Sequence, residues 1–235
     1  MMQPTTFHIA LGSNKGDKFK NLQDAVDAIH KRIGNINLIS KVYKSPAFGF
    51  KSDDFLNCCL VLESYLEPQN VLDILLDIET TLGRTRTHIN TYEARTIDLD
   101  IVFAEDKIIA TETLQLPHPE MQKRKFVLQP LHDVASKVKH PKLDKLVSVL
   151  LDECDDESVL EPIKIWLKNP SKSFNFSKYN YIAIEGNIGA GKTSLATKIA
   201  HDFNAKLILE RFADNPFLPK FYEDANRYAF TLEMS

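Results

Sequence analysis

Residues 96–103 read Thr-Ile-Asp-Leu-Asp-Ile-Val-Phe, and this alternation of apolar and polar side chains predicts a β-strand. On such a strand Asp98 and Asp100 point to the same face, about 6.6 Å apart, while the isoleucine and leucine side chains between them point into a core. Two adjacent carboxylates repel each other unless a cation lies beside them. The segment therefore predicts a strand with one face in a core and the other face suited to bind a cation.

The elements predicted upstream complete a fold around this strand. The pattern predicts strands at 6–11, 36–44 and 55–64, a helix over 19–33 that ends at Gly34, and a helix from Pro68 to Gly83. Gly12-Ser13-Asn14 is interpreted as a turn. The order β-α-β-β-α-β predicts an α+β, ferredoxin-like domain with both helices on one face of an antiparallel sheet. A C-terminal extension to about 150 adds a short strand pair and helical patterns at 126–134 and 143–151.

The composition changes after this domain. An acidic run at 152–157 (DECDDE) and a polar stretch at 168–180 indicate a linker. We expect a first domain over 1–160, a linker over 161–179 and a second domain over 180–235. The second region predicts strands at 181–185 and 206–210 around a P-loop and a helix, a partial α/β module. We expect it to be incomplete, because a doubly wound domain needs more than about 100 residues to cover its sheet.

Composition limits the classes of partner. The 235 residues are 43% hydrophobic and 26% charged, with a net charge of −3, so we expect no general attraction to nucleic acid or to an anionic membrane. Cys58, Cys59 and Cys154 form no CxxC pair and indicate a reduced, cytoplasmic protein. The first residues do not resemble a secretory signal, and no apolar run approaches the roughly 20 residues of a membrane-spanning helix.

Arginines and one histidine flank the carboxylate pair. Arg84, Arg86 and Arg95 precede it, and arginine forks match phosphate oxygens. Mg²⁺ prefers one or two carboxylates together with substrate phosphates, so the set favours phosphoryl transfer. The alternative is a solvated strand face whose carboxylates form ion pairs with the arginines. His118, between two prolines, is either an exposed loop residue or a ligand-binding group.

Aromatic and amide side chains gather around 45–57. Phe48, Phe55 and Asn57 are either core and turn residues or the stacking surfaces and hydrogen-bonding amide of a site for a flat heterocycle. With these residues the chain resembles a known family over about 5–160. The segments YKSPAFGF, FLNCCLVLE, LGRTR, RTIDLDIVF and LPHPEMQKRKFVLQPL resemble 6-hydroxymethyl-7,8-dihydropterin pyrophosphokinase of folate biosynthesis. That family has a ferredoxin-like fold.

The resemblance implies an enzyme that transfers pyrophosphate from MgATP to the pterin hydroxymethyl group and releases AMP. It implies that Asp98 and Asp100 bind two Mg²⁺ ions and that they act in catalysis with Arg84 and Arg95. The implied ATP-binding residues are Leu72, Arg84, Arg86, Arg95, Ile101, His118 and Arg124. The implied pterin-binding residues are Ser45, Pro46, Phe48, Phe55, Asn57 and Phe126.

The second region carries its own phosphate motif. Residues 186–193 fit G-x-x-x-x-G-K-[ST], in which backbone amides, a lysine and a hydroxyl bind phosphate and Mg²⁺. The phosphate-binding residues would be Gly186, Gly189, Gly191, Lys192 and Thr193. The segments EGNIGAGKTS and LILERFADNPFLPKFYEDANRYAF resemble bacterial deoxynucleoside kinases. The resemblance implies Glu210 as the general base and Tyr222 as the sugar contact; otherwise Glu210 is a carboxylate at the end of a strand.

Two other functions stay open at this point. The chain could be a deoxynucleoside 5′-kinase with a regulatory ferredoxin-like domain, which would yield ADP instead of AMP. It could also be a ferredoxin-like RNA-binding domain, which displays paired aromatic residues on its central strands. The strand CCLVLES, residues 58–64, lacks such rings, and the net charge is negative, so both features disfavour RNA binding.

Overall fold

The computed structural model describes residues 3–47, 52–84, 94–172, 180–187, 189–202, 206–209, 223–224 and 227. The chain divides into two compact units, Met1–Ser173 and Phe174–Ser235. No helix among these residues is both long and apolar enough to cross a membrane.

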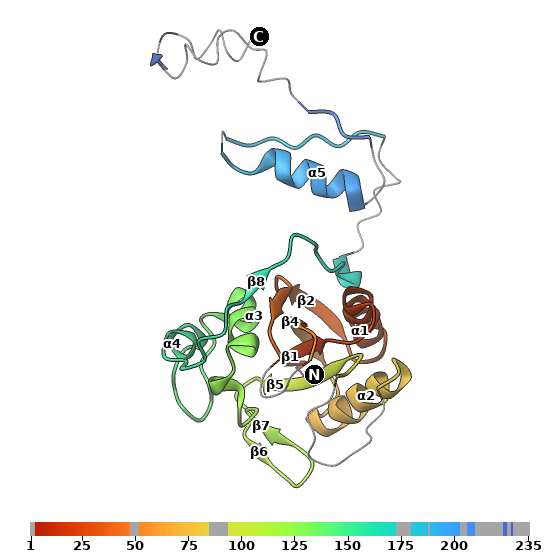
Figure 1. Ribbon diagram of the computed structural model, residues 1–235, viewed down its shortest axis with the longest axis vertical. Helices are drawn as coiled ribbons and strands as arrows, with labels where there is room; N and C mark the ends of the chain where they lie inside the picture. The colour runs from red at the N-terminus through yellow and green to blue at the C-terminus, as the bar shows by residue number, and fades with distance from the viewer. Residues whose placement is uncertain are drawn as a thin grey trace. The chain divides into compact units, whose positions relative to one another are not determined.

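The first unit is built on an antiparallel sheet with the strand order β5-β1-β4-β3-β8 (Figure 1). Its three long strands are β1 (Thr5–Ser13), β4 (Phe55–Ser64) and β5 (Asp98–Ala104). The shorter strands are β2 (Asn35–Ile39), β3 (Tyr43–Ser45) and β8 (Glu161–Pro162), and β2 also pairs with β4. Because β1 lies between β5 and β4, residues of these two strands lie opposite each other across it.

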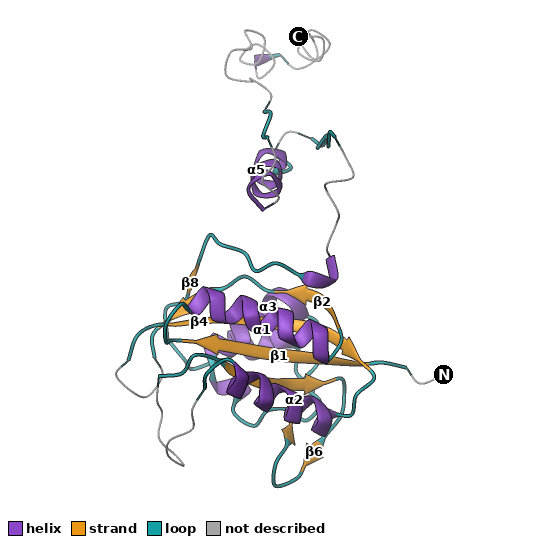
Figure 2. Ribbon diagram, turned by 90° about the vertical axis from the view of Figure 1, so that its right-hand side faces the viewer, coloured by secondary structure: helices purple, strands orange, loops and turns teal. Residues whose placement is uncertain are grey.

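Helices cover both faces of this sheet. Figure 1 shows α1 (Lys18–Arg32) and α2 (Pro68–Thr81) on one face, and α3 (Lys125–Ala135) and α4 (Val147–Asp152) on the other. Figure 2 shows α1 and α2 in front of the sheet and α3 behind it. The remaining elements are the strand pair β6 (Ile109–Ala110) and β7 (Gln115–Leu116), and the 3₁₀ helices η1 (Met121–Lys123) and η2 (Pro170–Lys172). The α+β class is confirmed, and the order β-α-β-β-α-β holds except that its second strand is divided into β2 and β3. The C-terminal extension supplies a third layer.

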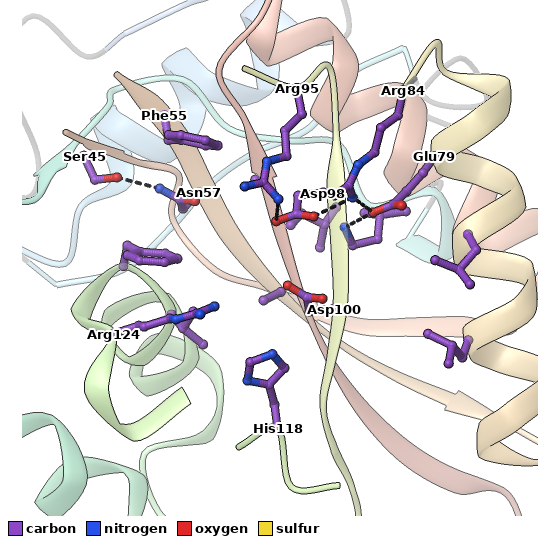
Figure 3. A pocket seen from close by; sticks show the side chains of 18 of the residues that line it. Ser45, Phe55, Asn57, Glu79, Arg84, Arg95, Asp98, Asp100, His118 and Arg124 are labelled. Atoms are coloured by element: carbon purple, nitrogen blue, oxygen red, sulfur yellow. Dashed lines mark hydrogen bonds and ion pairs between the residues drawn. The ribbon is translucent and has the colours of Figure 1, made fainter. Parts of the chain in front are cut away.

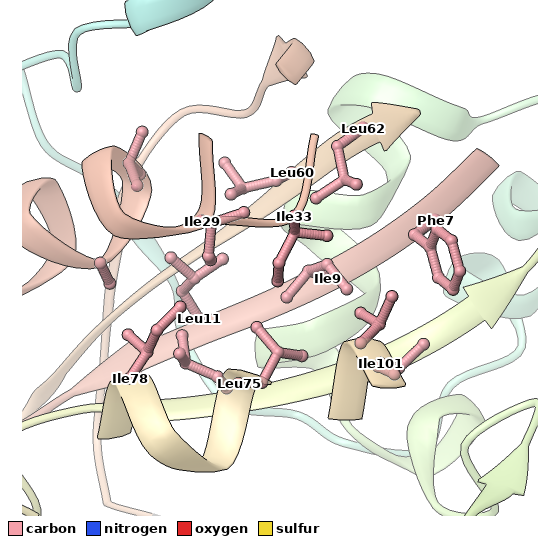
Figure 4. Close-up of a cluster of buried hydrophobic side chains, with 14 of the residues drawn as sticks. Phe7, Ile9, Leu11, Ile29, Ile33, Leu60, Leu62, Leu75, Ile78 and Ile101 are labelled. Carbon is pink, nitrogen blue, oxygen red and sulfur yellow. The ribbon is translucent and has the colours of Figure 1, made fainter. Parts of the chain in front are cut away.

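Two cores hold the layers together. Figure 4 shows the first, where Ile9 and Leu60 of the sheet meet Ile29 of α1 and Leu75 of α2. The second core lies under α3 and α4, and its fully or nearly fully buried members are Cys59, Val102, Phe103, Met121, Leu128, Leu131, Ala135, Val147 and Leu150. Because both faces are buried, the sheet forms a rigid platform for side chains at its end.

Two local predictions in the first unit need correction. The single strand expected over 36–44 is split into β2 and β3, because the Ser40 hydroxyl replaces a ladder partner and accepts the Cys59 amide at 2.9 Å. Gly34 follows α1 as expected, but for a different reason. A Cβ there would lie 2.0 Å from the Glu63 carbonyl oxygen, so glycine permits close packing against β4.

The segment after α4, which we call the strap (residues 153–172), belongs to the first unit. The sequence places its last part, 161–172, in a linker, yet β8 pairs with β3 and Leu167 is buried in the first core. Lys168 exchanges two hydrogen bonds with the Gln23 side chain, and Ser171 accepts the Ile36 amide at 2.8 Å. Polar composition misled the prediction because these contacts use backbone groups and side-chain amides.

The second unit contains the P-loop and α5 (Lys192–Asp202). Gly189 and Gly191 have φ angles of 81° and 80°, which glycine adopts without strain. The Lys192 ammonium donates to the carbonyls of Gly186 at 2.5 Å and Asn187 at 3.0 Å. The strands expected at 181–185 and 206–210 are absent from the described residues 181–185 and 206–209. A strand needs a partner for its backbone groups, and the described residues of this unit supply none.

Candidate active site

A cavity of about 280 Å³ opens in the first unit between the sheet, α2 and the beginning of α3. Twelve predicted site residues line it: Ser45, Pro46, Phe55, Asn57, Leu72, Arg84, Arg95, Asp98, Asp100, His118, Arg124 and Phe126. They come from segments that are up to 81 positions apart in the chain, counted from Ser45 to Phe126. The fold thus brings most of the predicted site together.

Strand register builds the floor of this cavity. Gly12 of β1 lies opposite Asn57 of β4 on one side and opposite Asp98 of β5 on the other. A Cβ on Gly12 would lie 3.0 Å from the Asn57 Oδ1 and 3.6 Å from the Phe55 ring. Glycine therefore leaves room between the amide and the carboxylate. The sequence indicates only a turn at this position, whereas β1 continues to Ser13.

Asp98 is the centre of an ion-pair network (Figure 3). One of its oxygens accepts Arg84 Nη1 at 2.5 Å, and the other accepts Arg95 Nη1 at 2.8 Å. Arg84 also pairs with Glu79, which is 2% exposed and accepts the Leu99 amide at 2.8 Å. Burial alone would lower the pKa of Arg84, but the charges of Asp98 and Glu79 outweigh it and raise the pKa. Two cations are thus held at the carboxylate pair.

Asp100 lies on the same face of β5, one pleat from Asp98. Burial, and next the charges of Asp98 and Glu79, raise the pKa of Asp100 to about 7, although Arg124 and Arg84 act in the opposite direction. Among the residues that the structure describes, no group of three or more histidines, cysteines, aspartates or glutamates could hold a metal ion. Two crowded carboxylates nevertheless fit Mg²⁺, because this ion takes one or two carboxylates and completes its shell with substrate phosphates and water.

His118 faces Asp100 across the cavity (Figure 3). Its Nδ1 accepts the Glu120 amide at 3.2 Å, so a neutral ring carries its proton on Nε2. Burial, followed by the charge of Arg124, lowers the pKa of His118 and favours this neutral form. The imidazole is therefore suited to donate a hydrogen bond to an oxygen in the cavity.

The other half of the cavity is less charged. Asn57 Nδ2 donates to Ser45 Oγ at 2.8 Å, and both side chains are buried. The Arg95 guanidinium lies 5.9 Å from the Phe55 ring centroid, and that of Arg124 lies 6.0 Å from the Phe126 ring centroid. Two phenyl rings and a fixed amide can bind a flat, hydrogen-bonding heterocycle.

Sequence reasoning missed two residues that hold this site in place. Glu79 follows Leu72 by seven positions, so a carboxylate on the inward stripe of α2 was the available signal. Asn14 is 1% exposed; its Oδ1 accepts the Arg95 amide at 2.7 Å, and its Nδ2 donates to the Ser52 hydroxyl at 3.0 Å. Asn14 therefore ties the arginine segment to the loop before β4, a role that its place in Gly12-Ser13-Asn14 does not reveal.

Some predicted residues do not join the cavity. Ile101 is 4% exposed and lies in the core beneath α1 and α2, on the face of β5 opposite Asp100, so it lines no part of this cavity. Phe48, Arg86, Glu210 and Tyr222 lie outside the described residues.

Comparisons with known proteins match the two units to two different families. Residues 8–136 match the family model of 7,8-dihydro-6-hydroxymethylpterin-pyrophosphokinase, and residues 182–235 match that of deoxynucleoside kinase. The 2-amino-4-hydroxy-6-hydroxymethyldihydropteridine pyrophosphokinase of Synechocystis sp. is 36% identical over 152 residues, which cover 64% of this chain and 77% of that protein. The Porphyromonas gingivalis enzyme of the same name is 40% identical over 132 residues, 54% of this chain and 89% of its own length.

Larger relatives contain a similar region. The folic acid synthesis protein FOL1 of Dictyostelium discoideum is 38% identical over 137 residues, but the chain, 58% of which is matched, spans only 20% of that protein. A solved HPPK-DHPS structure with substrates has a TM-score of 0.54 at 13% identity, covering 65% of this chain and 43% of that one. The Plasmodium falciparum HPPK-DHPS structure has the same score at 15% identity, covering 64% and 44%. These structures support the fold alone.

The fold and the site define an α+β phosphoryl-transfer domain, in which two carboxylates and three arginines share a cavity with two phenyl rings. The family model covers more than half of the chain. The chain belongs to the 7,8-dihydro-6-hydroxymethylpterin-pyrophosphokinase family, and its first unit is an ATP-dependent pyrophosphokinase domain.

Proposed function

We propose that the first unit transfers the β,γ-pyrophosphoryl group of MgATP to 6-hydroxymethyl-7,8-dihydropterin in folate biosynthesis and releases AMP. The observation that carries this proposal is the strand register, in which Gly12 of β1 lies between Asn57 of β4 and Asp98 of β5. It places a heterocycle-binding amide and a phosphate-side carboxylate on neighbouring strands of one cavity. The named relatives support the same reaction.

In the nucleotide half, charged groups would bind and orient the phosphates. Arg84 and Arg95 now pair with Asp98, and phosphate oxygens would compete for the same guanidinium groups. Arg124 lines the same cavity, and His118 would donate from Nε2 to a phosphate oxygen. Leu72 would contact the adenine ring. These groups position the chain of phosphates and neutralise its charge, which is most of what phosphoryl transfer requires.

In the pterin half, Phe55 and Phe126 would stack on the two faces of the ring, and Asn57 would bind its edge. Ser45 holds the Asn57 amide, so the direction of this hydrogen-bonding group is fixed before the pterin arrives. Ser45 and Pro46 line the cavity beside it. The ring would thereby present its hydroxymethyl oxygen to the phosphates.

The reaction is a displacement at the β-phosphorus. The hydroxymethyl oxygen forms a bond to that phosphorus and loses its proton to solvent. The bond from the β-phosphorus to the oxygen that bridges to the α-phosphate breaks, and AMP leaves with this bridging oxygen. We propose that Asp98 and Asp100 hold two Mg²⁺ ions. These ions would neutralise phosphate charge and lower the pKa of the attacking hydroxyl.

Product analysis tests this proposal. Incubation of the chain with MgATP and 6-hydroxymethyl-7,8-dihydropterin should yield AMP and the pterin pyrophosphate in equal amounts. In a parallel incubation with MgATP and deoxynucleosides, ADP with a phosphorylated deoxynucleoside would instead indicate the kinase with a regulatory first unit, which the relatives do not favour. Absence of AMP would contradict the pyrophosphokinase.

We further propose that the second unit is a module of the deoxynucleoside kinase type. The family match over 182–235 and the two glycines with positive φ support it. Glu210 and Tyr222 stay predicted as base and sugar contact. We expect residues 1–235 to form no ADP when deoxynucleosides are supplied, because the described residues around the P-loop form no strand. Deoxynucleotide formation would contradict this expectation.

A further inference from the structure

The acidic run after α4 supplies a cap for α3. Asp156 Oδ2 accepts the backbone amide of Lys125 at 2.9 Å, although 31 residues separate the two. The other oxygen of Asp156 accepts the Ser158 amide at 2.9 Å and also binds the Ser158 hydroxyl. Arg124 is the N-cap residue of α3, but its own side chain makes no capping hydrogen bond. The first turn of α3 therefore takes its cap from the strap.

The capped amide lies between two residues of the cavity. The Lys125 amide belongs to the peptide unit that joins Arg124 to Lys125, and Phe126 follows at the next position. Holding this amide restrains the backbone dihedrals on both sides of it, and these set the directions of the Arg124 and Phe126 side chains. Both side chains line the cavity.

The strap also contacts the opposite wall of the pterin half. β8 pairs with β3 through Lys44↔Glu161 and Tyr43↔Pro162, and the Ile163 amide donates to the Val42 carbonyl at 2.9 Å. The next residue after Lys44 is Ser45, whose hydroxyl accepts Asn57 Nδ2. One segment thus contacts both the α3 side and the β3 side of the pterin half.

We propose that Asp156 is a positioning residue for pterin binding, which acts through the first turn of α3 as part of a strap that holds the two walls of the pterin half together. The inference rests on the proposed function of the first unit. Burial by itself would raise the pKa of Asp156, but hydrogen bonds from Ser158 and from the Lys125 amide outweigh it and lower the pKa. A charged carboxylate is favourable at the N-terminus of a helix.

The test compares Asp156→Ala with two matched variants of the full chain. Ser171→Ala removes an equivalent strap contact, a side-chain oxygen that accepts the Ile36 amide at 2.8 Å, on the β2 side of the strap. Asp155→Ala removes the same charge from the neighbouring, exposed position. Asp156→Asn keeps one acceptor oxygen but places an NH2 group where the other oxygen accepts Ser158, so it serves as a partial-rescue variant.

Two measurements are made on each variant. Hydrogen exchange of the amides at 125–128 reports the first turn of α3 without any ligand. Titration with 6-hydroxymethyl-7,8-dihydropterin, at a saturating concentration of a non-hydrolysable ATP analogue, reports the pterin half. We expect Asp156→Ala to speed the exchange at 125–128. We also expect it to weaken pterin binding about fivefold, because loss of a cap destabilises a helix by a similar factor. Asp156→Asn should fall between wild type and Asp156→Ala, and the two control variants should not change pterin binding.

Unchanged exchange at 125–128 in Asp156→Ala would overturn the proposal. So would faster exchange with unchanged pterin affinity, or an equal loss of affinity in Ser171→Ala, because either result would reduce Asp156 to a structural contact. A wild-type chain that binds no pterin would contradict the proposed function instead. In that case the exchange measurement still decides whether Asp156 holds the first turn of α3.

Discussion

The two units each carry phosphate-handling residues, but in different surroundings. In the first unit, Asp98 and Asp100 lie on a strand that is paired with β1 and packed between two cores, and the two arginine partners of Asp98 are already in place. In the second unit, the P-loop lysine binds the carbonyls of its own loop. The residues of this unit that the structure describes form the helix α5 and no strand. The difference is a packed sheet, which aims the phosphate-handling groups of the first unit at one cavity.

The largest expected effect comes from the carboxylate pair. Asp98→Ala or Asp100→Ala should lower turnover to AMP by at least about a hundredfold. Each change removes a carboxylate that would bind the Mg²⁺ ions, and these ions would neutralise the charge of the phosphates. The matched change in the second unit, Lys192→Ala, should leave AMP formation unchanged. Steady-state assays of AMP formation measure these effects, and far-ultraviolet circular dichroism checks that each variant is folded. Near-normal turnover in both aspartate variants would discredit their role.

The strap defines where the first unit ends. Residues 1–173 should fold and form AMP, whereas residues 1–160 should lose about 3 kcal/mol of stability or more, since they lack buried Leu167 and the hydrogen bonds to Gln23 and Ile36. Urea unfolding followed by circular dichroism measures the difference. Equal urea midpoints for the two fragments would show that residues 161–172 add no stability, as expected of the linker that the sequence indicates.

Glu79 offers a smaller effect on the same unit. Glu79→Ala should destabilise it by about 3 kcal/mol, because the change leaves the Leu99 amide and part of the Arg84 charge without an acceptor in a buried place. The only tryptophan, Trp166, lies in the strap, so its fluorescence reports unfolding of the first unit. The exposed Glu67→Ala, at the N-cap of α2, is a suitable control, since its side chain makes no capping hydrogen bond. A loss no greater than in that control would show that the network is dispensable.

The smallest predicted effect concerns acid stability. Burial lowers the pKa of His8 from 6.5 to about 4, and its ring packs edge-on against Phe103 at 5.6 Å. The folded state favours neutral His8, so this stabilisation is complete above pH 6.5 and is lost as the pH falls toward 4. By pH 5 the loss should reach about 2 kcal/mol. His8→Phe should flatten the dependence of unfolding free energy on pH in this interval; an unchanged slope would assign it to other groups.

Local pattern was enough to predict much of the first unit. Alternation located β4 over 55–64, and helical spacing and Pro68 located α2. The carboxylate and arginine motifs located Arg84, Arg95, Asp98 and Asp100, whereas most of the other cavity residues came from the family resemblance. What it missed depends on contacts between distant segments. Asn14 meets Arg95 across 81 positions, Asp156 meets Lys125 across 31, and the strands expected in the second unit have no described partner. Such pairings leave no periodic signal in one sequence.

The most direct test of the central claim is a crystal structure of residues 1–173 with Mg²⁺, a non-hydrolysable ATP analogue and 6-hydroxymethyl-7,8-dihydropterin. We predict Asp98 and Asp100 bound to magnesium, Arg84 and Arg95 moved from Asp98 onto phosphate oxygens, and the pterin between Phe55 and Phe126. Both carboxylates free of metal, with the two arginines still paired to Asp98, would contradict the account.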